Sequence, residues 1–312
     1  MKSFYSFILC LYGLILILSH ITQGILPFEW VISFSPYLVF FSILLCLLSV
    51  ILALKKKLNV SLLALIGIAL IVAGTFAIGE KVLSFTTVLP EKGIGTQAVT
   101  LVSFNKYYKN TNYAAIDSAI QRIQPDIIGF IEIISADVSG IEQLKNFPYS
   151  QTNAIDDPFS FGIFSRYPLN KITIKQTGIR NVLTSEVTIN DKKYIVLMVH
   201  AYPPVTMRDI EKRNSELIAI QKYINNVGTE NVIIMGDFNT TPWSKTYDTF
   251  TSGLKQLKNT AKGKGLNFTW GAIPIQAHID HIFVPSKAII EEFKIEYIKG
   301  SDHRLIWSKV KL

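Results

Sequence analysis

Acidic, amide and histidine side chains recur at the ends of apolar segments in the carboxyl-terminal two thirds of the chain. The clearest case is NVIIMGDFNTTPWS, residues 231–244, in which an apolar run ends at Asp237 and Asn239. Side chains alternate across a strand, so residues two apart point the same way where the extended conformation continues. Under that condition Asp237 and Asn239 would share one face at the rim of a sheet.

Five other segments carry polar residues in the same position. Such residues follow or interrupt the runs AVTLVSF, DIIGFI, YIVLMV, HIDHIFV and GSDHRLIW. They are Asn105, Glu132, His200, the pair Asp280 and His281, and the pair Asp302 and His303. A buried carboxylate is costly unless it has a partner, a metal ion or solvent. Each residue alone could be an edge acid, a rim histidine or a turn cap, but packing does not explain the whole set.

The residue types in this set favour a hard metal ion. Carboxylates and amides offer oxygen ligands, which suit Mg²⁺ or Mn²⁺, and the only cysteines, Cys10 and Cys46, lie in apolar amino-terminal segments. A zinc site in HIDH would need a bulge, because His278 and Asp280 point away from His281 on a regular strand. Histidines beside a metal can transfer protons and stabilise negative charge. The combination favours metal-assisted hydrolysis of a phosphate ester.

Three long segments without Asp, Glu, Lys or Arg precede this region. A bilayer core of about 30 Å takes about 20 helical residues, so each segment is long enough to cross it. We expect transmembrane helices at about 4–22, 31–54 and 58–79. A cleaved signal peptide is the weaker alternative for the first segment, because it lacks an A-x-A site and two more segments follow.

The basic residues around these segments predict their orientation. Lys2 precedes the first segment and three lysines, 55–57, separate the second from the third, whereas the loop at Glu29 has no basic residue. Basic loops stay in the cytoplasm. We therefore expect a multi-pass protein of the cell membrane whose carboxyl-terminal domain lies on the extracytoplasmic side.

The pattern divides the chain into a membrane anchor at 1–80, a linker at 81–97 that is rich in Gly, Pro and Thr, and a domain at 98–312. Strand and helix patterns alternate in this domain, with a hairpin turn expected at Asn190 and Asp191. An α/β fold of two packed sheets flanked by helices follows. The net charge of +8 favours anionic partners: phosphate esters, nucleic acid or anionic lipid head groups.

The motifs SFN, IE, FGIFSRYP, VHAYPP, GDFNTTPWS, FTW, IDHIFV and GSDHRLI occur in the order typical of the endonuclease/exonuclease/phosphatase superfamily, which the chain resembles over about residues 98–310. The match is closest to bacterial members that are anchored by amino-terminal membrane spans. The resemblance implies a four-layer α/β sandwich, with two packed mixed β-sheets flanked by helices. It also implies divalent-metal-dependent cleavage of phosphate esters.

The resemblance further implies roles for individual residues. Glu132 corresponds to the principal metal-binding glutamate, Asn105 would help to hold the metal or its shell, and Asp302 would sit beside it. His281 stands where the family often has an aromatic residue, which indicates a structural role or a supporting role behind the residues that contact the metal.

The catalytic residues implied by the resemblance are His200, Asp237, Asn239, Asp280 and His303. Asp237 would orient or deprotonate the attacking water, while Asn239 and His200 would bind the phosphate. Asp280 would pair with His303, which would stabilise charge in the transition state. His200 is also a candidate general acid.

These observations predict a membrane-tethered, Mg²⁺- or Mn²⁺-dependent phosphohydrolase, acting on a phosphodiester in particular. The substrate alternatives are a lipid head group or small molecule on one side, and DNA or RNA cleaved by an extracytoplasmic nuclease on the other. The lipid bilayer is the expected partner of the amino-terminal helices, and no obligate protein partner is inferred. A non-enzymatic binding module with the same fold is a third and weaker alternative.

Overall fold

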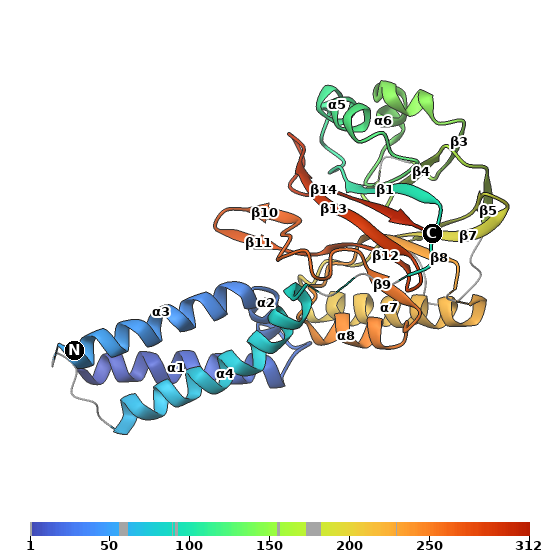
Figure 1. Cartoon of the computed structure of the whole chain (residues 1–312). Coiled ribbons are helices and arrows are strands. Elements are labelled where there is room, and N and C mark those ends of the chain that lie inside the picture. The colour runs from blue at the N-terminus through green and yellow to red at the C-terminus, as the bar shows by residue number, and fades with distance from the viewer. Residues whose placement is uncertain are drawn as a thin grey trace. The chain divides into compact units, whose positions relative to one another are not determined.

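The computed structural model describes two compact units. It covers residues 2–55, 62–88, 90, 93–154, 157–172, 182–228 and 230–312. One unit comprises Met1–Thr87 with Thr241–Asp248, and the other comprises Val88–Thr240 with Thr249–Leu312 (Figure 1).

The first unit is built from apolar helices. They are α1 (Lys2–Ile21), the short α2 (Phe28–Ser33), α3 (Ser35–Leu54) and α4 (Leu62–Thr86). Three of them, α1, α3 and α4, are long and apolar enough to cross a membrane, which confirms the three expected apolar helices. α4 continues to Thr86 and so into the segment 81–97 expected to be a linker. The reason is that residues 81–86, KVLSFT, include no helix-breaking Gly or Pro.

Small residues let α1 and α4 approach closely. A Cβ atom added at Gly67 or Gly74 of α4 would overlap Leu9 or Leu16 of α1. Glycine at such positions is how helices pack where no hydrophobic effect drives them together. In the same unit, the segment Thr241–Asp248 contributes Trp243, which is fully buried and whose indole nitrogen donates to the Ser33 carbonyl oxygen at 2.8 Å.

The second unit contains two six-stranded sheets. The first has the order β13 (Ile289–Tyr297), β14 (Arg304–Lys311), β1 (Ala98–Asn105), β2 (Ile127–Ile131), β4 (Phe161–Ser165), β3 (Tyr149–Thr152). The second has the order β5 (Leu169–Ile172), β6 (Val182–Ile189), β7 (Lys192–His200), β8 (Val232–Asp237), β12 (Asp280–Pro285), β9 (Leu257–Asn259). Both are mixed, because β1–β2 and β7–β8 are parallel pairs among antiparallel ones. A separate ribbon is formed by β10 (Trp270–Ala272) and β11 (Ile275–Ala277).

Helices flank the sheets and complete the expected α/β sandwich. They are α5 (Tyr113–Ile123), α6 (Ser135–Gly140), a 3-10 turn (Glu142–Asn146), α7 (Met207–Val227) and α8 (Lys245–Ser252). Figure 1 shows α5 and α6 together on the outer side of the first sheet. The predicted hairpin joins β6 and β7, and its turn residues Asn190 and Asp191 have the positive φ that such a turn requires.

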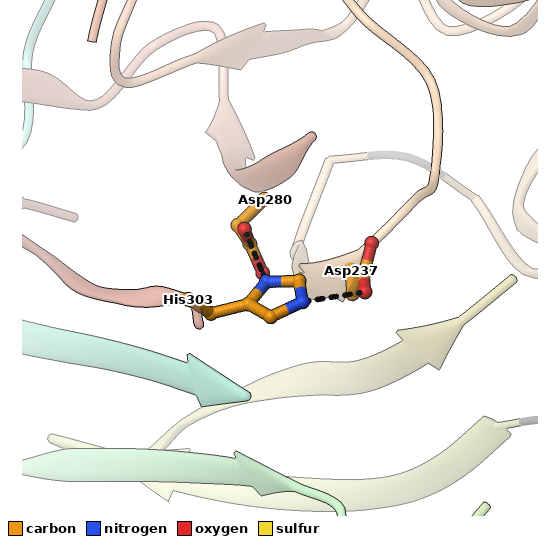
Figure 2. A group of neighbouring side chains, drawn as sticks. All are labelled: Asp237, Asp280 and His303. Carbon is orange, nitrogen blue, oxygen red and sulfur yellow. Dashed lines mark hydrogen bonds and ion pairs between the residues drawn. The ribbon is translucent and has the colours of Figure 1, made fainter. Parts of the chain in front are cut away.

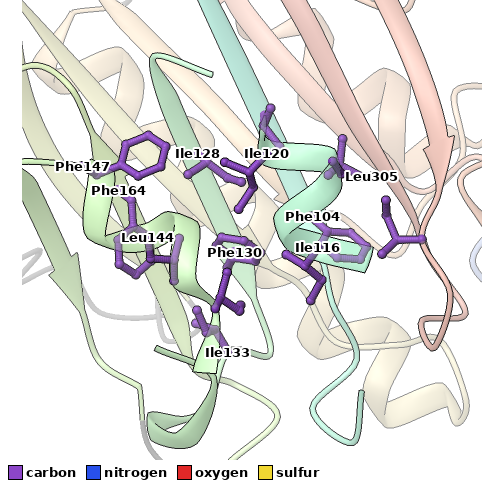
Figure 3. Close-up of a cluster of buried hydrophobic side chains, with 14 residues drawn as sticks. Phe104, Ile116, Ile120, Ile128, Phe130, Ile133, Leu144, Phe147, Phe164 and Leu305 are labelled. Carbon is purple, nitrogen blue, oxygen red and sulfur yellow. The ribbon is translucent and has the colours of Figure 1, made fainter. Parts of the chain in front are cut away.

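The core of the first sheet lies under α5. Ile116 and Ile120 on one face of α5 pack on Phe104, Phe130 and Leu305 of the sheet (Figure 3). This spacing of three to four residues is what places an apolar stripe on one side of a helix. The stripe fixes α5 on the outer face, so the inner face of the sheet is left for the second sheet.

The two sheets pack face to face. Gly129 of β2 lies directly against the second sheet, because a Cβ there would overlap the side chain of Met198 on β7. The polar ends of strands from both sheets therefore meet along one edge of the sandwich.

Candidate active site

Strand pairing places three of the predicted site residues side by side. His200 ends β7 opposite Asp237 on β8, and Asp237 in turn faces Asp280 on β12. In the other sheet, Asn105 ends β1 and Glu132 directly follows β2, which runs parallel to β1. The carboxyl ends of these parallel strands thus bring the groups to one edge.

A turn rather than a continued strand connects Asp237 to Asn239. β8 ends at Asp237, Phe238 is buried, and Asn239 has a left-handed backbone with φ of 47°. The Asn239 amide donates to Asp237 Oδ1 at 2.9 Å. The extended conformation therefore does not continue to Asn239, because a side chain that accepts the amide two residues on stabilises a turn.

Gly236 allows Asp237 to lie so close to β7. Its φ is 146°, and a Cβ at this position would overlap the carbonyl oxygen of Val199. Only glycine takes this backbone conformation without strain. The glycine in GDFN is thus explained by the close approach of β7 and β8 directly before the carboxylate.

His303 connects two buried carboxylates (Figure 2). Its Nδ1 lies 2.9 Å from Asp280 Oδ2, and its Nε2 lies 3.6 Å from Asp237 Oδ2. Burial alone would lower the pKa of His303, but the carboxylates of Asp280 and Asp237 outweigh it and raise the pKa to about 10. His303 is therefore a cation at neutral pH, with Nε2 directed at Asp237.

The pKa of Asp237 is also raised, but here burial is the main cause. Burial and the neighbouring Asp280 raise its pKa to about 8, although the charge of His303 lowers it. Asp237 is a stronger base than an ordinary carboxylate as a result. Groups with pKa values shifted in this way by burial and by specific charge partners are typical of active sites.

His200 is held in one tautomer. Its Nδ1 lies 3.1 Å from the Pro158 carbonyl oxygen, which can only accept, so the proton is on Nδ1. Nε2 lies 3.8 Å from Asp237 Oδ2 and 3.9 Å from Glu132 Oε1. Burial and the charge of His303 lower the pKa of His200 to about 4. The resting imidazole is neutral and presents a lone pair to the site.

Asn105 joins the carboxylates of the two sheets. Its Nδ2 lies 3.1 Å from Glu132 Oε1 and 3.3 Å from Asp237 Oδ2. Glu132 Oε2 accepts the backbone amide of Tyr108 at 3.0 Å. Glu132 also has a left-handed backbone, with φ of 59°, a strained conformation that persists where the surroundings enforce it.

Two predicted residues lie at the margin of this cluster. Asn239 donates through Nδ2 to the Ala201 carbonyl oxygen at 2.9 Å. Asp302 is exposed, and its Oδ2 accepts the indole N–H of Trp270 at 3.0 Å, so it acts on His303 only through its charge. The structure thus brings together Asn105, Glu132, His200, Asp237, Asp280 and His303.

His281 has structural contacts. Its Nε2 lies 3.0 Å from the Thr240 carbonyl oxygen, and its Nδ1 lies 3.1 Å from Asn259 Nδ2. The ring also stacks on that of His278, whose Nδ1 contacts the Leu266 carbonyl oxygen. These contacts use His281 away from the site, in keeping with its expected structural role.

A buried ion pair supports the loop that follows Asn105, and the sequence did not reveal it. Lys106 Nζ lies 2.8 Å from Asp137 Oδ2, and both side chains are inaccessible to solvent. Lys106 also donates to the carbonyl oxygens of Tyr107 and Tyr108, which fixes the amide of Tyr108 that binds Glu132. The only sequence signal was a lysine directly after the strand-end asparagine.

Three further residues position the site from outside. Thr269 Oγ1 accepts the backbone amide of Asp280, and Ser301 Oγ accepts that of His303. The buried Arg213 donates to the Asn239 carbonyl oxygen at 2.9 Å. Hydroxyl and guanidinium groups in such roles have no spacing rule along the chain, so they emerge only from the fold.

The donor set fits a hard divalent cation. Ligand atoms of Asp237, Asp280 and His303 lie within 4.8 Å of one another, and the Glu132 carboxylate is joined to Asp237 through Asn105. His303 is cationic and already bonded to Asp280, so it is a poor ligand, whereas the carboxylate oxygens of Glu132 and Asp237 are suitable ones. Asn105 presents its nitrogen to them and therefore positions the ligands.

The pairing of Asp280 with His303 can be tested by titration. In Asp280→Asn, the pKa of His303 should fall from about 10 toward the ordinary value of about 6.5, because the main charge partner is lost. The imidazolium signal, followed by NMR of histidine-labelled protein and assigned with His303→Gln, should then disappear at lower pH. Asp302→Asn is the control and should cause a smaller shift. An unchanged pKa in Asp280→Asn would contradict the assignment.

The fold of the second unit resembles solved structures. TDP2 of D. rerio, in a complex with a single-strand DNA product, matches with a TM-score of 0.59 and 17% identity over 70% of this chain and 100% of its own. An endonuclease/exonuclease/phosphatase family protein of Bacteroides thetaiotaomicron matches with a TM-score of 0.54 and 14% identity. The match covers 69% of this chain and 97% of that protein. An endonuclease/exonuclease/phosphatase of Beutenbergia cavernae matches with a TM-score of 0.56 and 14% identity, over 70% of this chain and 72% of its own. At these identities the likeness concerns the fold.

Sequence comparison identifies the family. No curated protein matches the chain. The model of the Endonuclease/Exonuclease/phosphatase family matches residues 102–303, well over half of the chain, and this range includes every residue of the cluster. The chain therefore belongs to the endonuclease/exonuclease/phosphatase family.

Proposed function

We propose that the chain is a membrane-anchored phosphodiesterase that uses Mg²⁺ or Mn²⁺. The observation that carries the proposal is the convergence of Glu132, Asp237 and the Asp280–His303 pair where the strands of both sheets end. Enzymes of this family hydrolyse phosphate esters with divalent metal ions. The acids and histidines that such chemistry requires are all present in this chain.

Glu132 would hold the cation together with an oxygen of Asp237, and Asn105 would keep the two carboxylates in place. When bound, the cation would neutralise charge on the phosphate and favour the ionised form of Asp237. Asp302 would add negative charge at the edge of the site. Oxygen-only ligation is the reason for preferring Mg²⁺ or Mn²⁺ to zinc.

Asp237 would orient the attacking water and take its proton. As the water oxygen bonds to phosphorus, the bond to the leaving oxygen breaks. The leaving oxygen takes a proton from solvent water, and Asp237 later returns the proton it accepted to solvent. His303 would donate from Nε2 to a phosphate oxygen, with Asp280 keeping the imidazole charged. Asn239 would add a hydrogen bond to the phosphate, and the Nε2 lone pair of neutral His200 would accept one from the water.

A nuclease is the second candidate function. It is favoured by the structural neighbour TDP2, whose complex contains a single-strand DNA product, and by the net positive charge of this chain. A phosphoester of the bilayer is favoured by the three long apolar helices, which would keep the site close to lipid. The two candidate functions share the same hydrolytic chemistry. They differ only in whether the phosphodiester belongs to a nucleic acid or to a lipid.

Loss of the base should abolish hydrolysis. We expect Asp237→Ala to lower the turnover number for a phosphodiester by about 10³-fold or more, since general-base and electrostatic contributions are both removed. Glu211→Ala, at an exposed acid on α7, is the matched control and should retain activity. The full chain in detergent would be assayed with Mg²⁺ or Mn²⁺ and with chelator. Unchanged turnover in Asp237→Ala would refute the enzymatic role.

The same preparation distinguishes the two candidate substrates. Plasmid DNA, phospholipid vesicles, sphingomyelin, inositol phosphates and nucleotides would be supplied in parallel. A rate of DNA cleavage that falls steeply as the salt concentration rises would indicate a nuclease. Contacts to DNA phosphates release counterions, so DNA binding weakens at high salt. Release of soluble phosphate compounds from vesicles would indicate a lipid substrate.

We infer that the second unit lies on the extracytoplasmic side, because Lys2 and the three lysines 55–57 predict that the first helix starts, and the second and third are joined, in the cytoplasm. Alkaline phosphatase, which folds only outside the cytoplasm, should be active when fused after Leu312. An expressed but inactive fusion would reverse this orientation.

A further inference from the structure

The β10–β11 ribbon carries an exposed apolar tip. Its turn runs through Ala272, Ile273, Pro274 and Ile275, all of which are exposed, with Ile273 at 86% and Ile275 at 59%. No charged residue occurs from Trp270 to Ala277. Figure 1 shows the ribbon as a separate two-stranded element that extends away from the sheets. Neither isoleucine belongs to the buried core of the residues that the structure describes, so core packing does not explain them.

The base of the ribbon is polar and aromatic. Trp270 is half-buried there, and the preceding loop exposes Lys262 and Lys264. Tryptophan prefers the boundary between lipid and water, and lysines are attracted to anionic head groups. An apolar tip, an aromatic base and nearby lysines form the sequence of layers that a segment needs in order to enter a bilayer surface.

The ribbon is attached directly to the candidate active site. Trp270 forms an isolated bridge with His303, and the amide of Gly271 donates to the Asp302 carbonyl oxygen at 3.0 Å. A strand advances about 3.3 Å per residue, so the tip at Ile273 lies about 10 Å along the ribbon from Trp270. Whatever the tip contacts is therefore held close to the catalytic groups.

We propose that the β10–β11 tip inserts into the surface of the lipid bilayer and holds the active site against the head groups. This inference rests on the membrane anchoring proposed above. Only residues 87–97 join α4 to β1, and eleven extended residues span at most about 40 Å. Within the second unit, part of this linker is also bonded to the sheets, through Ile94 to Lys287 and Thr96 to Leu312. The tether thus keeps the second unit in the neighbourhood of the bilayer that the apolar helices would span, so a lipid surface is an apolar phase available to it.

Other occupants fit the tip less well. A nucleic acid could contact the nearby lysines but would leave the uncharged apolar tip exposed to water. A second copy of the chain would have to supply a complementary apolar surface, which the experiment below detects separately.

The test places a fluorescent probe at the tip of the full chain in vesicles. Cys10→Ser and Cys46→Ala remove the native thiols, and Ile273→Cys introduces one for an NBD label. Ile218→Cys, at an exposed isoleucine on α7, is the matched control. Vesicles of phosphatidylcholine and phosphatidylglycerol contain phosphatidylcholine with a doxyl quencher at acyl carbon 5. Thermal unfolding confirms that each labelled variant is folded.

We expect quenching at position 273 to exceed that at position 218 by about twofold or more, and Ile275→Asp to reduce it by about half or more, because a charge opposes insertion. Equal quenching at the two positions in protein that floats with the vesicles would overturn the inference while leaving the catalytic proposal intact. A signal that follows protein density instead of doxyl lipid would assign the tip to a second copy and would also overturn it. Protein that does not float with vesicles would refute the anchoring and the inference together.

Discussion

Burial of the Asp237 carboxylate between Asp280 and His303 is the interaction on which the rest of the structure depends. Each of these side chains is almost fully shielded from water, so none can be removed without leaving an uncompensated neighbour. Breaking such a buried pair typically costs about 3–5 kcal/mol. The same burial makes the groups reactive, because it holds a cation at His303 and strengthens Asp237 as a base. Stability and chemistry are thus coupled in one cluster.

The fold meets this constraint with close backbone approaches and local supports. Gly236 lets β8 run against β7, so that Asp237 and His200 lie at the same level. The buried Lys106–Asp137 pair fixes the loop beside Glu132, although Lys106 itself is costly to bury. Positive φ angles at Glu132 and Asn239 show that the backbone accepts strain at the site. Such strain persists only where packing around it is well determined.

The sequence predicted the elements better than the contacts among them. Apolar runs and alternation gave the strands, and the absence of charge over three long segments gave the apolar helices. Strand-end polarity identified the residues that converge, because the carboxyl ends of β1, β2, β7 and β8 lie at the same edge as the amino ends of the antiparallel strands β12 and β14. The turn at Asn239 was missed because local hydrogen bonding to Asp237 overrides alternation. Lys106, Asp137 and Arg213 could not be inferred, because their partners are distant in sequence and depend on how loops pack.

The position of Asp302 shows a second limit of sequence reasoning. Its place beside His303 suggested a direct role at the metal, but its carboxylate is bonded to the indole of Trp270 at the base of the β10–β11 ribbon. Asp302 lies in a bend directly before His303, and its carboxylate is turned toward Trp270 while His303 enters the cluster. Two adjacent residues can therefore serve different contacts, and only the fold shows which of them faces the site.

The central claim is that Glu132 and Asp237 share one divalent cation. Binding of Mn²⁺ to the full chain in detergent, followed by electron paramagnetic resonance, tests it directly and requires no substrate. We predict that Glu132→Gln and Asp237→Asn each weaken binding by about tenfold or more, whereas Glu211→Gln has no effect. Mn²⁺ binding that is unchanged in both site variants would contradict the account.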